Sequence, residues 1–357
     1  MVMRAKRPDS SPQRLLQAGN RKKVMGFAAL SLAIFMLFSL YLSGCTRGRN
    51  STGPPSADPG SSLVPDPAEP QEPDEDALEG MFLVSIGNNP SGRPQSGLSE
   101  AAVVFEVPAE GGMTRLMAGF DKKVEKIGPV RSARKPLVQI AVGFDIPFAH
   151  CGGSEDSFEI IRAHKTKSLD EIYSAGECFW RSNDRSAPDN LYTSITKIEQ
   201  GASRRGFASF HPEFYATGEL QGTPALGVSY AFSNSSKYPN LVEYRYEDSG
   251  YIRFINGREH VNDKGESIAP KTLAFLQVYT EYLQGKAIEV DMDVTGKGKA
   301  LFFSNGVMCE GTWSKPSLKE PIQFHIGDNG EGLEEGLLWI HLVPDLAKIV
   351  IRASLGE

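Results

Sequence analysis

The chain has 357 residues, of which 40% are hydrophobic and 9% aromatic, so it can bury a sizeable core and is long enough for two domains. Its formal net charge is -6. Residues 1–44 carry seven Lys/Arg and one acidic residue, a charge of +6, so residues 45–357 carry −12. An acidic chain lacks the basic footprint that nucleic-acid-binding proteins need, and we expect no nucleic-acid partner.

Residues 1–44 have the organisation of a lipoprotein signal peptide. Basic residues precede the uncharged apolar run MGFAALSLAIFMLFSLY (25–41), and small residues then lead to Cys45. The run is at the lower length limit for spanning a bilayer, so an uncleaved transmembrane anchor is the alternative. The tetrapeptide LSGC resembles the lipobox of bacterial lipoproteins, in which the cysteine is lipidated. We therefore predict a lipid anchor on Cys45 and a location on the extracytoplasmic face of the cell membrane.

Residues 45–80 are predicted to form a disordered or polyproline-like tether. Between Thr46 and Leu78 there are seven prolines in 33 residues, several acidic residues and no aromatic residue, so the segment cannot bury enough apolar surface to fold.

Residues 81–222 show an α/β pattern. Short apolar runs bounded by turn residues predict strands, and apolar residues at helical spacing predict helices. The expected strands are MFLVSIG (81–87), AAVVFEV (101–107), MTRLMAGF (113–120) and PFAHC (147–151), and the expected helices are 136–144, 155–165 and 194–206. Ser154 is the expected N-cap of the second helix.

Residues 223–357 are expected to form a second domain that is mostly antiparallel β. Alternating apolar and polar residues are interrupted by tight turns, and Asn256-Gly257 and Asn305-Gly306 are the dipeptides that most strongly favour two-residue hairpin turns. The fold class is therefore an α/β or α+β N-terminal domain followed by a mostly β domain.

Standard catalytic and cofactor motifs are missing from the sequence. We find no Gly-x-Ser-x-Gly, no His-Glu-x-x-His and no P-loop, and the histidines do not have metal-ligand spacing, so no metal or cofactor is expected. His150 and Cys151 are adjacent, but neighbouring side chains in a strand point to opposite faces, which argues against a thiol nucleophile. Buried free thiols are the favoured expectation for the cysteines, and a disulfide between Cys151 and Cys178 is the alternative.

Carboxylates and arginines are the more informative groups. Glu106 and Glu110 bracket Pro108, Arg115 follows on the next expected strand, and Arg131 and Arg134 come after it. If adjacent strands carry these residues, they converge at one end of the sheet, where α/β proteins commonly bind ligands. Three interpretations remain open: structural pairing of the two glutamates with Arg131 and Arg134, an anion or glycan site, and acid/base catalysis of the kind that glycosidases perform with paired carboxylates.

The stretch IGPVRSARKP (127–136) favours the anion site. Pro136 suits the first turn of a helix, so the preceding basic residues form the loop that leads to the helix N-terminus, where free backbone N–H groups attract anions. A second group, FWRSNDRSAPDNLYTS (179–194), combines Trp180 with arginines and amides, as a sugar site does. The candidate catalytic residues are Glu106 and Glu110, and the candidate ligand-binding residues are Arg93, Arg115, Arg131, Ser132, Arg134, Arg181, Arg185, Asn190 and Tyr192.

Several long strings resemble the YerB-type bacterial lipoprotein family, which consists of two consecutive domains of unknown function. The strings are RPQSGLSEAAVVFEVPAEGGMTRLMAGF, KIGPVRSARKP, FWRSNDRSAPDNLYTS and GKALFFSNGVMCEGTW, and the resemblance covers nearly all of residues 81–343. It implies a surface lipoprotein and a two-domain architecture but brings no reaction or ligand. Two positions depart from the family pattern: Gly87 stands where an aspartate is usual, and Asp189 where a histidine is usual.

Two functional hypotheses follow. In the first, the membrane-anchored ectodomain binds an anionic envelope component, such as a wall glycan, a wall peptide or a protein of the wall machinery. In the second, it is an envelope hydrolase or transferase that uses Glu106 or Glu110 as general acid/base. Close approach of the two carboxylates around an open cleft would favour the enzyme, and burial against arginines would favour binding or a structural role.

Overall fold

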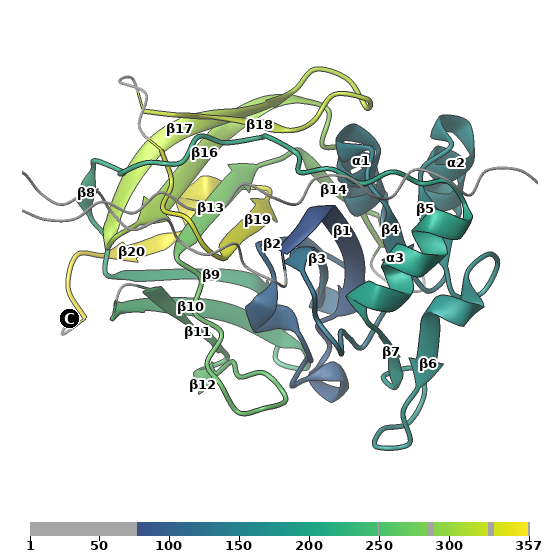
Figure 1. The fold of residues 1–357 in the computed structure, drawn as a ribbon. Coiled ribbons are helices and arrows are strands. Elements are labelled where there is room, and N and C mark those ends of the chain that lie inside the picture. Colours follow the sequence, from purple (N-terminus) through teal and green to yellow (C-terminus); the bar gives the residue numbers. More distant parts are fainter. Residues whose placement is uncertain (1–76, 249, 284–288, 328–331, 356–357) are drawn as a thin grey trace, which may run out of the picture. The chain divides into compact units, whose positions relative to one another are not determined.

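The computed structural model describes residues 77–248, 250–283, 289–327 and 332–355, which belong to one compact unit (Figure 1). The predicted signal peptide, Cys45 and nearly all of the predicted tether lie outside the described residues. Within the described residues, no helix is both long enough and apolar enough to cross a membrane.

The N-terminal segment combines strands with all three α-helices of the described chain. Its elements are β1 (Ala77–Gly87), η1 (Pro90–Gly92), η2 (Leu98–Glu100), β2 (Val103–Pro108), η3 (Glu110–Gly112), β3 (Thr114–Lys122), α1 (Lys135–Phe144), β4 (Phe148–His150), α2 (Glu155–His164), β5 (Ser168–Asp170), η4 (Gly176–Cys178), β6 (Phe179–Arg181), β7 (Leu191–Thr193) and α3 (Ile195–Arg204). The α/β character predicted for this segment is confirmed.

The C-terminal segment is almost entirely β, as predicted. Its elements are β8 (Thr223–Pro224), β9 (Gly227–Asn234), β10 (Pro239–Glu247), β11 (Gly250–Ile255), β12 (Arg258–Glu259), β13 (Thr272–Gln277), β14 (Thr280–Leu283), β15 (Glu289–Met292), β16 (Gly296–Ser304), β17 (Val307–Lys315), β18 (Gln323–Ile326), β19 (Leu338–Val343), η5 (Leu346–Lys348) and β20 (Val350–Arg352). Both predicted hairpin turns form, with positive φ at Asn256, Gly257, Asn305 and Gly306, as two-residue turns of this type require.

One large sheet runs through both segments, in the order β18-β17-β16-β13-β19-β2-β3-β1-β4-β5, with β8 paired to β17. The two segments meet where β19 pairs in parallel with β2, so a strand from near the C-terminus is hydrogen-bonded to one from the N-terminal segment. A second sheet, β12-β11-β10-β9-β20, is antiparallel throughout.

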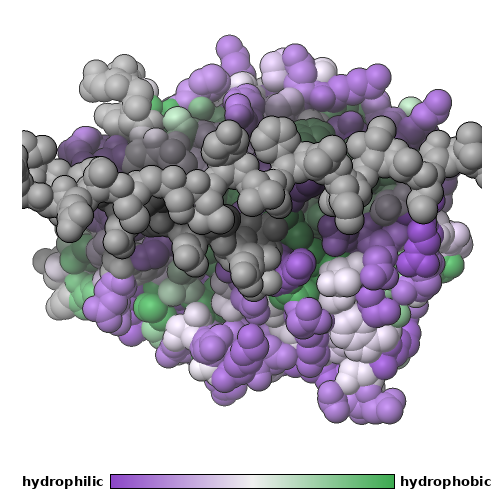
Figure 2. All heavy atoms as spheres, viewed as in Figure 1, coloured by the Kyte–Doolittle hydropathy of each residue, from purple (hydrophilic) through white to green (hydrophobic). Residues whose placement is uncertain are grey.

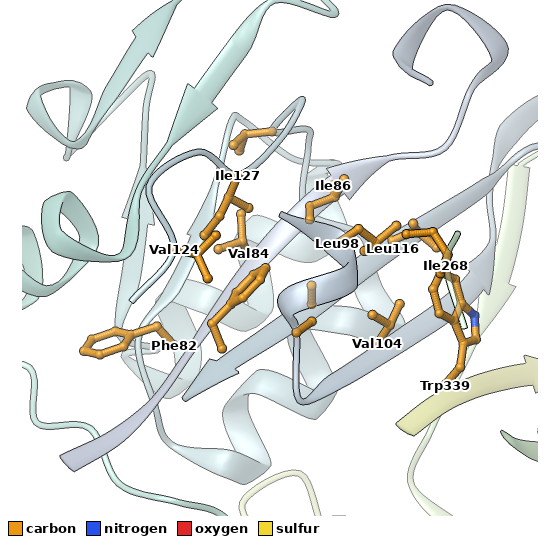
Figure 3. Close-up of a cluster of buried hydrophobic side chains, with 14 of the residues drawn as sticks. Phe82, Val84, Ile86, Leu98, Val104, Leu116, Val124, Ile127, Ile268 and Trp339 are labelled. Carbon is orange, nitrogen blue, oxygen red and sulfur yellow. The ribbon is translucent and has the colours of Figure 1, made fainter. Parts of the chain in front are cut away.

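The two faces of the large sheet contribute to different hydrophobic cores. On β1, Phe82, Val84 and Ile86 belong to one core, and Met81 and Leu83 to the other, as alternation along a strand requires. The first core also contains residues of α3 and of the second sheet, and Figure 3 shows it from β1 to Trp339 of β19. The second core contains the buried residues of α1. The second sheet and α1 therefore cover opposite faces.

Two local details differ from the sequence expectation. β1 begins at Ala77, before the expected start at Met81. Ser154 occupies the N-cap position of α2, as expected, but its hydroxyl makes no capping hydrogen bond to a backbone N–H and bonds instead with the hydroxyl of Ser157, at 2.7 Å. The surface visible in Figure 2 is mostly hydrophilic, with hydrophobic residues in small areas.

Candidate functional site

A pocket of about 590 Å³ lies at the end of the large sheet where β1, β2 and β4 terminate. Three arginines line it: Arg115 at the start of β3, and Arg131 and Arg134 from the loop before α1. We call it the arginine pocket. Its location at the carboxyl ends of parallel strands is the place where the sequence predicted a ligand site.

Sheet pairing fixes the position of Arg115. It lies opposite Gly87 on β1 and Val107 on β2, in the middle of three neighbouring strands. Along β3, Arg115 alternates with Leu116 and so shares the face of Met117, which belongs to the core that α1 covers. The guanidinium group of Arg115 is therefore on the side of the sheet from which α1 begins.

Backbone hydrogen bonds hold the loop that carries Arg131 and Arg134. The N–H of Arg131 donates to the carbonyl of Ser85 (2.9 Å), and the carbonyl of Arg131 accepts from the N–H of Cys151 (3.0 Å). Arg134 is the N-cap residue of α1 and Pro136 lies in its first turn, as predicted. The arginines are thus fixed between the end of β1, the end of β4 and the N-terminus of α1.

The arginine pocket holds more positive than negative charge. Arg131 Nη2 lies 2.8 Å from Asp189 Oδ1, and Arg134 Nε lies 2.7 Å from Glu110 Oε1. No described residue forms a hydrogen bond or ion pair with the guanidinium group of Arg115, whose Nε and Nη1 are shielded from solvent. Two carboxylates therefore neutralise only part of the charge of the three guanidinium groups.

The surroundings of Arg115 favour an added anion. Burial, together with the charges of Arg134 and Arg131, lowers the pKa of Arg115 to about 9, against the opposing influence of Glu110 and Asp189. A buried donor that lacks a partner is costly, and so is the proximity of like charges. A bound anion would relieve both costs.

Glu106 does not line this pocket. Its side chain is fully buried; Oε1 accepts hydrogen bonds from Thr114 (2.7 Å) and Asn88 (3.2 Å), and Oε2 from Arg253 Nη2 and Trp339 Nε1 (both 2.8 Å). Burial alone would raise the pKa of Glu106, but the charge of Arg253, the nearby His341 and the hydrogen bonds lower it below the ordinary value. Glu106 is an ionised, enclosed carboxylate.

The expected pairing of the glutamates is half right. Glu110 pairs with Arg134, as the structural interpretation predicted, but Glu106 pairs with Arg253, and Arg131 pairs with Asp189. The reason is strand alternation: Glu106 shares the face of Val104, which is in the core against the second sheet, whereas Glu110 lies beyond the end of β2. No signal in the sequence links Glu106 to a residue 147 positions away.

The paired-carboxylate geometry of an acid/base enzyme is therefore not favoured. Glu106 is closed to solvent and has every oxygen occupied. Burial would raise the pKa of Glu110, but the hydrogen bond and charge of Arg134 lower it, which keeps this group ionised as well. A general acid or base works best with a pKa near the working pH, and neither carboxylate meets this condition.

Most of the second predicted group holds a loop together. Arg181 donates to Asn190 Oδ1 (3.0 Å) and pairs with Glu171 (3.3 Å), and Arg185 donates to the carbonyls of Gly92 (2.8 Å) and Pro94 (2.6 Å). Tyr192 is buried beside Trp180, with ring centroids 6.3 Å apart. None of these residues lines the arginine pocket, whereas Ser132 does and Arg93 lines a neighbouring pocket.

The two departures from the family pattern lie beside the same arginine. A Cβ atom at Gly87 would lie 2.8 Å from Cγ of Arg131, and Asp189 is the carboxylate that pairs with Arg131. Asp189 also accepts hydrogen bonds from Asn89 (3.0 Å) and Ser91 (2.8 Å). Both departures therefore change the immediate surroundings of Arg131, although the two positions are about 100 residues apart in the sequence.

The two cysteine hypotheses, a thiol nucleophile and a disulfide, find no support in the described residues. Cys151 and Cys178 are not joined by a disulfide, so the pairing expected as one alternative is absent. Burial and the neighbouring Glu171 raise the pKa of Cys151 to about 12, which disfavours a thiolate. Across the described residues, no three His, Cys, Asp or Glu side chains are grouped to hold a metal ion.

Comparisons with known proteins place the chain in a family. Residues 68–208 match the N-terminal domain, and residues 228–340 the C-terminal domain, of the protein of unknown function DUF3048. The chain is 31% identical over 288 residues to "Putative lipoprotein YerB" of Bacillus subtilis (strain 168), covering 76% of this chain and 84% of that protein.

A solved structure has the same fold. The crystal structure of the YerB protein from Bacillus subtilis superimposes with a TM-score of 0.67 and 28% identity, covering 78% of this chain and 94% of that one. The fold, the two consecutive domains and the level of identity agree with one another. The chain therefore belongs to the YerB-type family of DUF3048 proteins.

Proposed function

We propose that this protein is an extracytoplasmic lipoprotein, anchored through Cys45, whose arginine pocket binds an anionic group of a cell-envelope component. The anchor rests on the LSGC sequence and on the similarity to a protein described as a lipoprotein. The binding function rests chiefly on one observation: Arg115 lines the pocket, yet no described residue pairs with it.

Two further features support an anion as the ligand. Guanidinium groups present several N–H donors in a fixed plane, which matches the oxygens of carboxylate and phosphate groups. The pocket also adjoins the N-terminus of α1, where Pro136 has no N–H and other first-turn N–H groups are not used within the helix. An envelope polymer with carboxylate or phosphate groups fits these requirements.

A structural role for the same arginines predicts a different result. Removing an arginine that stabilises the fold should lower the stability of the protein, whereas removing one of several arginines that repel one another should not. Replacing Arg115 by Gln removes one of three neighbouring positive charges without leaving any described carboxylate unpaired. We expect the melting temperature of Arg115→Gln to equal or exceed that of the wild type.

Binding to isolated wall sacculi tests the proposal. The full chain, purified in detergent, should sediment with sacculi. Arg115→Gln should bind at least about tenfold more weakly and with a smaller dependence on salt, because a buried charge-assisted contact contributes about 1.5–3 kcal/mol. Arg245→Gln, an exposed arginine on β10, is the matched control. Unchanged binding of Arg115→Gln, or a loss that merely follows a lower melting temperature, would contradict the proposal.

A further inference from the structure

A second pocket, of about 490 Å³, lies next to the arginine pocket. It is lined by Arg93 and Pro94 on one side and by residues around Arg258 on the other, and Pro90 lines both pockets. The short turn η1, Pro90–Gly92, thus separates two adjacent hollows. We call the second one the Arg93 pocket.

The Arg93 pocket also has free guanidinium groups. Nε of Arg93 is shielded from solvent without a partner, and no described residue forms a hydrogen bond or ion pair with the guanidinium group of Arg93 or of the exposed Arg258. The one acidic residue in the lining, Glu259, accepts a hydrogen bond from the hydroxyl of Ser267. Two positive groups therefore face one negative group that is already engaged.

Arg93 is not needed to neutralise the buried Glu106. Burial and the charge of Arg253 lower the pKa of Arg93, and Glu106 opposes them, but the oxygens of Glu106 are occupied by Asn88, Thr114, Arg253 and Trp339. Nor is Arg93 needed to hold η1, because Arg185 already donates to the carbonyls of Gly92 and Pro94. An arginine that serves only the fold usually has its buried donors satisfied, as Arg185 does.

We propose that the ligand is a linear chain of phosphate groups that crosses η1 and places its terminal phosphate in the arginine pocket and another phosphate further along the chain in the Arg93 pocket. This rests on the proposed function and identifies the chemical class of its ligand. One small anion cannot fill two pockets separated by a turn, whereas a repeating polymer can. Phosphate is favoured over carboxylate because the terminal phosphate of such a chain has three free oxygens, which the three guanidinium groups of the arginine pocket can share, whereas a planar carboxylate offers two oxygens.

Length dependence of binding tests this proposal. The full chain in detergent is titrated with orthophosphate, with linear polyphosphate and with polyglutamate. Simultaneous occupation of two sites raises affinity well beyond that of one, so polyphosphate should bind at least about a hundredfold more tightly than orthophosphate. Polyglutamate should bind more weakly than polyphosphate of equal charge. Equal affinity for orthophosphate and polyphosphate, or equal affinity for the two polymers, would overturn the assignment.

Variants of the Arg93 pocket separate this proposal from the function on which it rests. Arg93→Gln combined with Arg258→Gln should remove most of the advantage of polyphosphate over orthophosphate, and Arg258→Gln alone, at an exposed position, should remove part of it without a change in melting temperature. Arg245→Gln is again the control. If the wild type binds neither the phosphate probes nor polyglutamate, the proposed function fails. If it binds polyglutamate but no phosphate probe, or binds the phosphate probes without either variant reducing the polymer advantage, only the present inference fails.

Discussion

The buried ion pair between Glu106 and Arg253 should be the most sensitive point of the fold. The two side chains are fully buried, with Arg253 Nη2 2.8 Å from Glu106 Oε2, and they join β2 of the N-terminal segment to β11 of the second sheet. Arg253 also donates from Nε to the hydroxyl of Tyr244 at 3.0 Å. Replacing Arg253 with Met keeps an apolar chain of similar length and removes these interactions.

The expected cost follows from the carboxylate that remains. Removing one partner of a buried ion pair costs about 3–5 kcal/mol, because the other charge is left without compensation. Glu106 would keep the hydrogen bonds from Thr114, Asn88 and Trp339, so we expect a value near the lower end of that range. Since folded proteins have unfolding free energies of about 5–15 kcal/mol, Arg253→Met should lose a large fraction of its stability.

Urea denaturation of the full chain, followed by intrinsic fluorescence, measures this cost. Arg245→Met is the matched control: Arg245 is an exposed arginine on the neighbouring strand, stacked 4.3 Å from the ring centroid of Phe254, and its loss should cost about 1 kcal/mol or less. The double variant Glu106→Leu/Arg253→Met should lose less unfolding free energy than the two single variants lose together. An Arg253→Met protein as stable as Arg245→Met would refute this reasoning.

Two further predictions concern the anchor and the buried histidine. Cys45→Ala should abolish incorporation of a fatty-acid analogue during metabolic labelling and retain the signal segment; equal labelling of wild type and variant would exclude lipidation at Cys45. Burial, partly opposed by Glu106, lowers the pKa of His341 to about 3. Below pH 6.5 this histidine therefore binds a proton in the unfolded chain but not in the folded chain. Acidification from pH 6.5 towards pH 3 should reduce the unfolding free energy by up to about 1.4 kcal/mol per pH unit. His341→Gln should flatten this dependence relative to His325→Gln at an exposed position, and parallel pH profiles would contradict the assignment.

Local features of the fold were predictable because their causes are local. Pro136 at the start of α1 and the Asn-Gly turns at 256–257 and 305–306 are set by backbone conformation, and the structure confirms them. The clustering of Arg115, Arg131 and Arg134 at one end of the sheet followed from strand alternation and from the expected loop before α1.

Pairing between distant segments was not predictable in the same way. The run LWIHLV (338–343) is β19, buried along its whole length and parallel to both neighbours. A continuous apolar run is the pattern of a strand buried on both faces, but it does not name its partner. The same limit applies to side chains: the partners of Glu106 and Arg131 are Arg253 and Asp189, which only the folded chain brings together.

The most direct test of the central claim is to locate an anion in the arginine pocket. Crystals of the protein soaked in selenate, a tetrahedral dianion with a strong anomalous signal, should show an anomalous peak within hydrogen-bond distance of the guanidinium groups of Arg115, Arg131 and Arg134, and crystals of Arg115→Gln should lack it. A wild-type pocket without a peak, or one in which a carboxylate of the chain itself pairs with Arg115, would contradict the account.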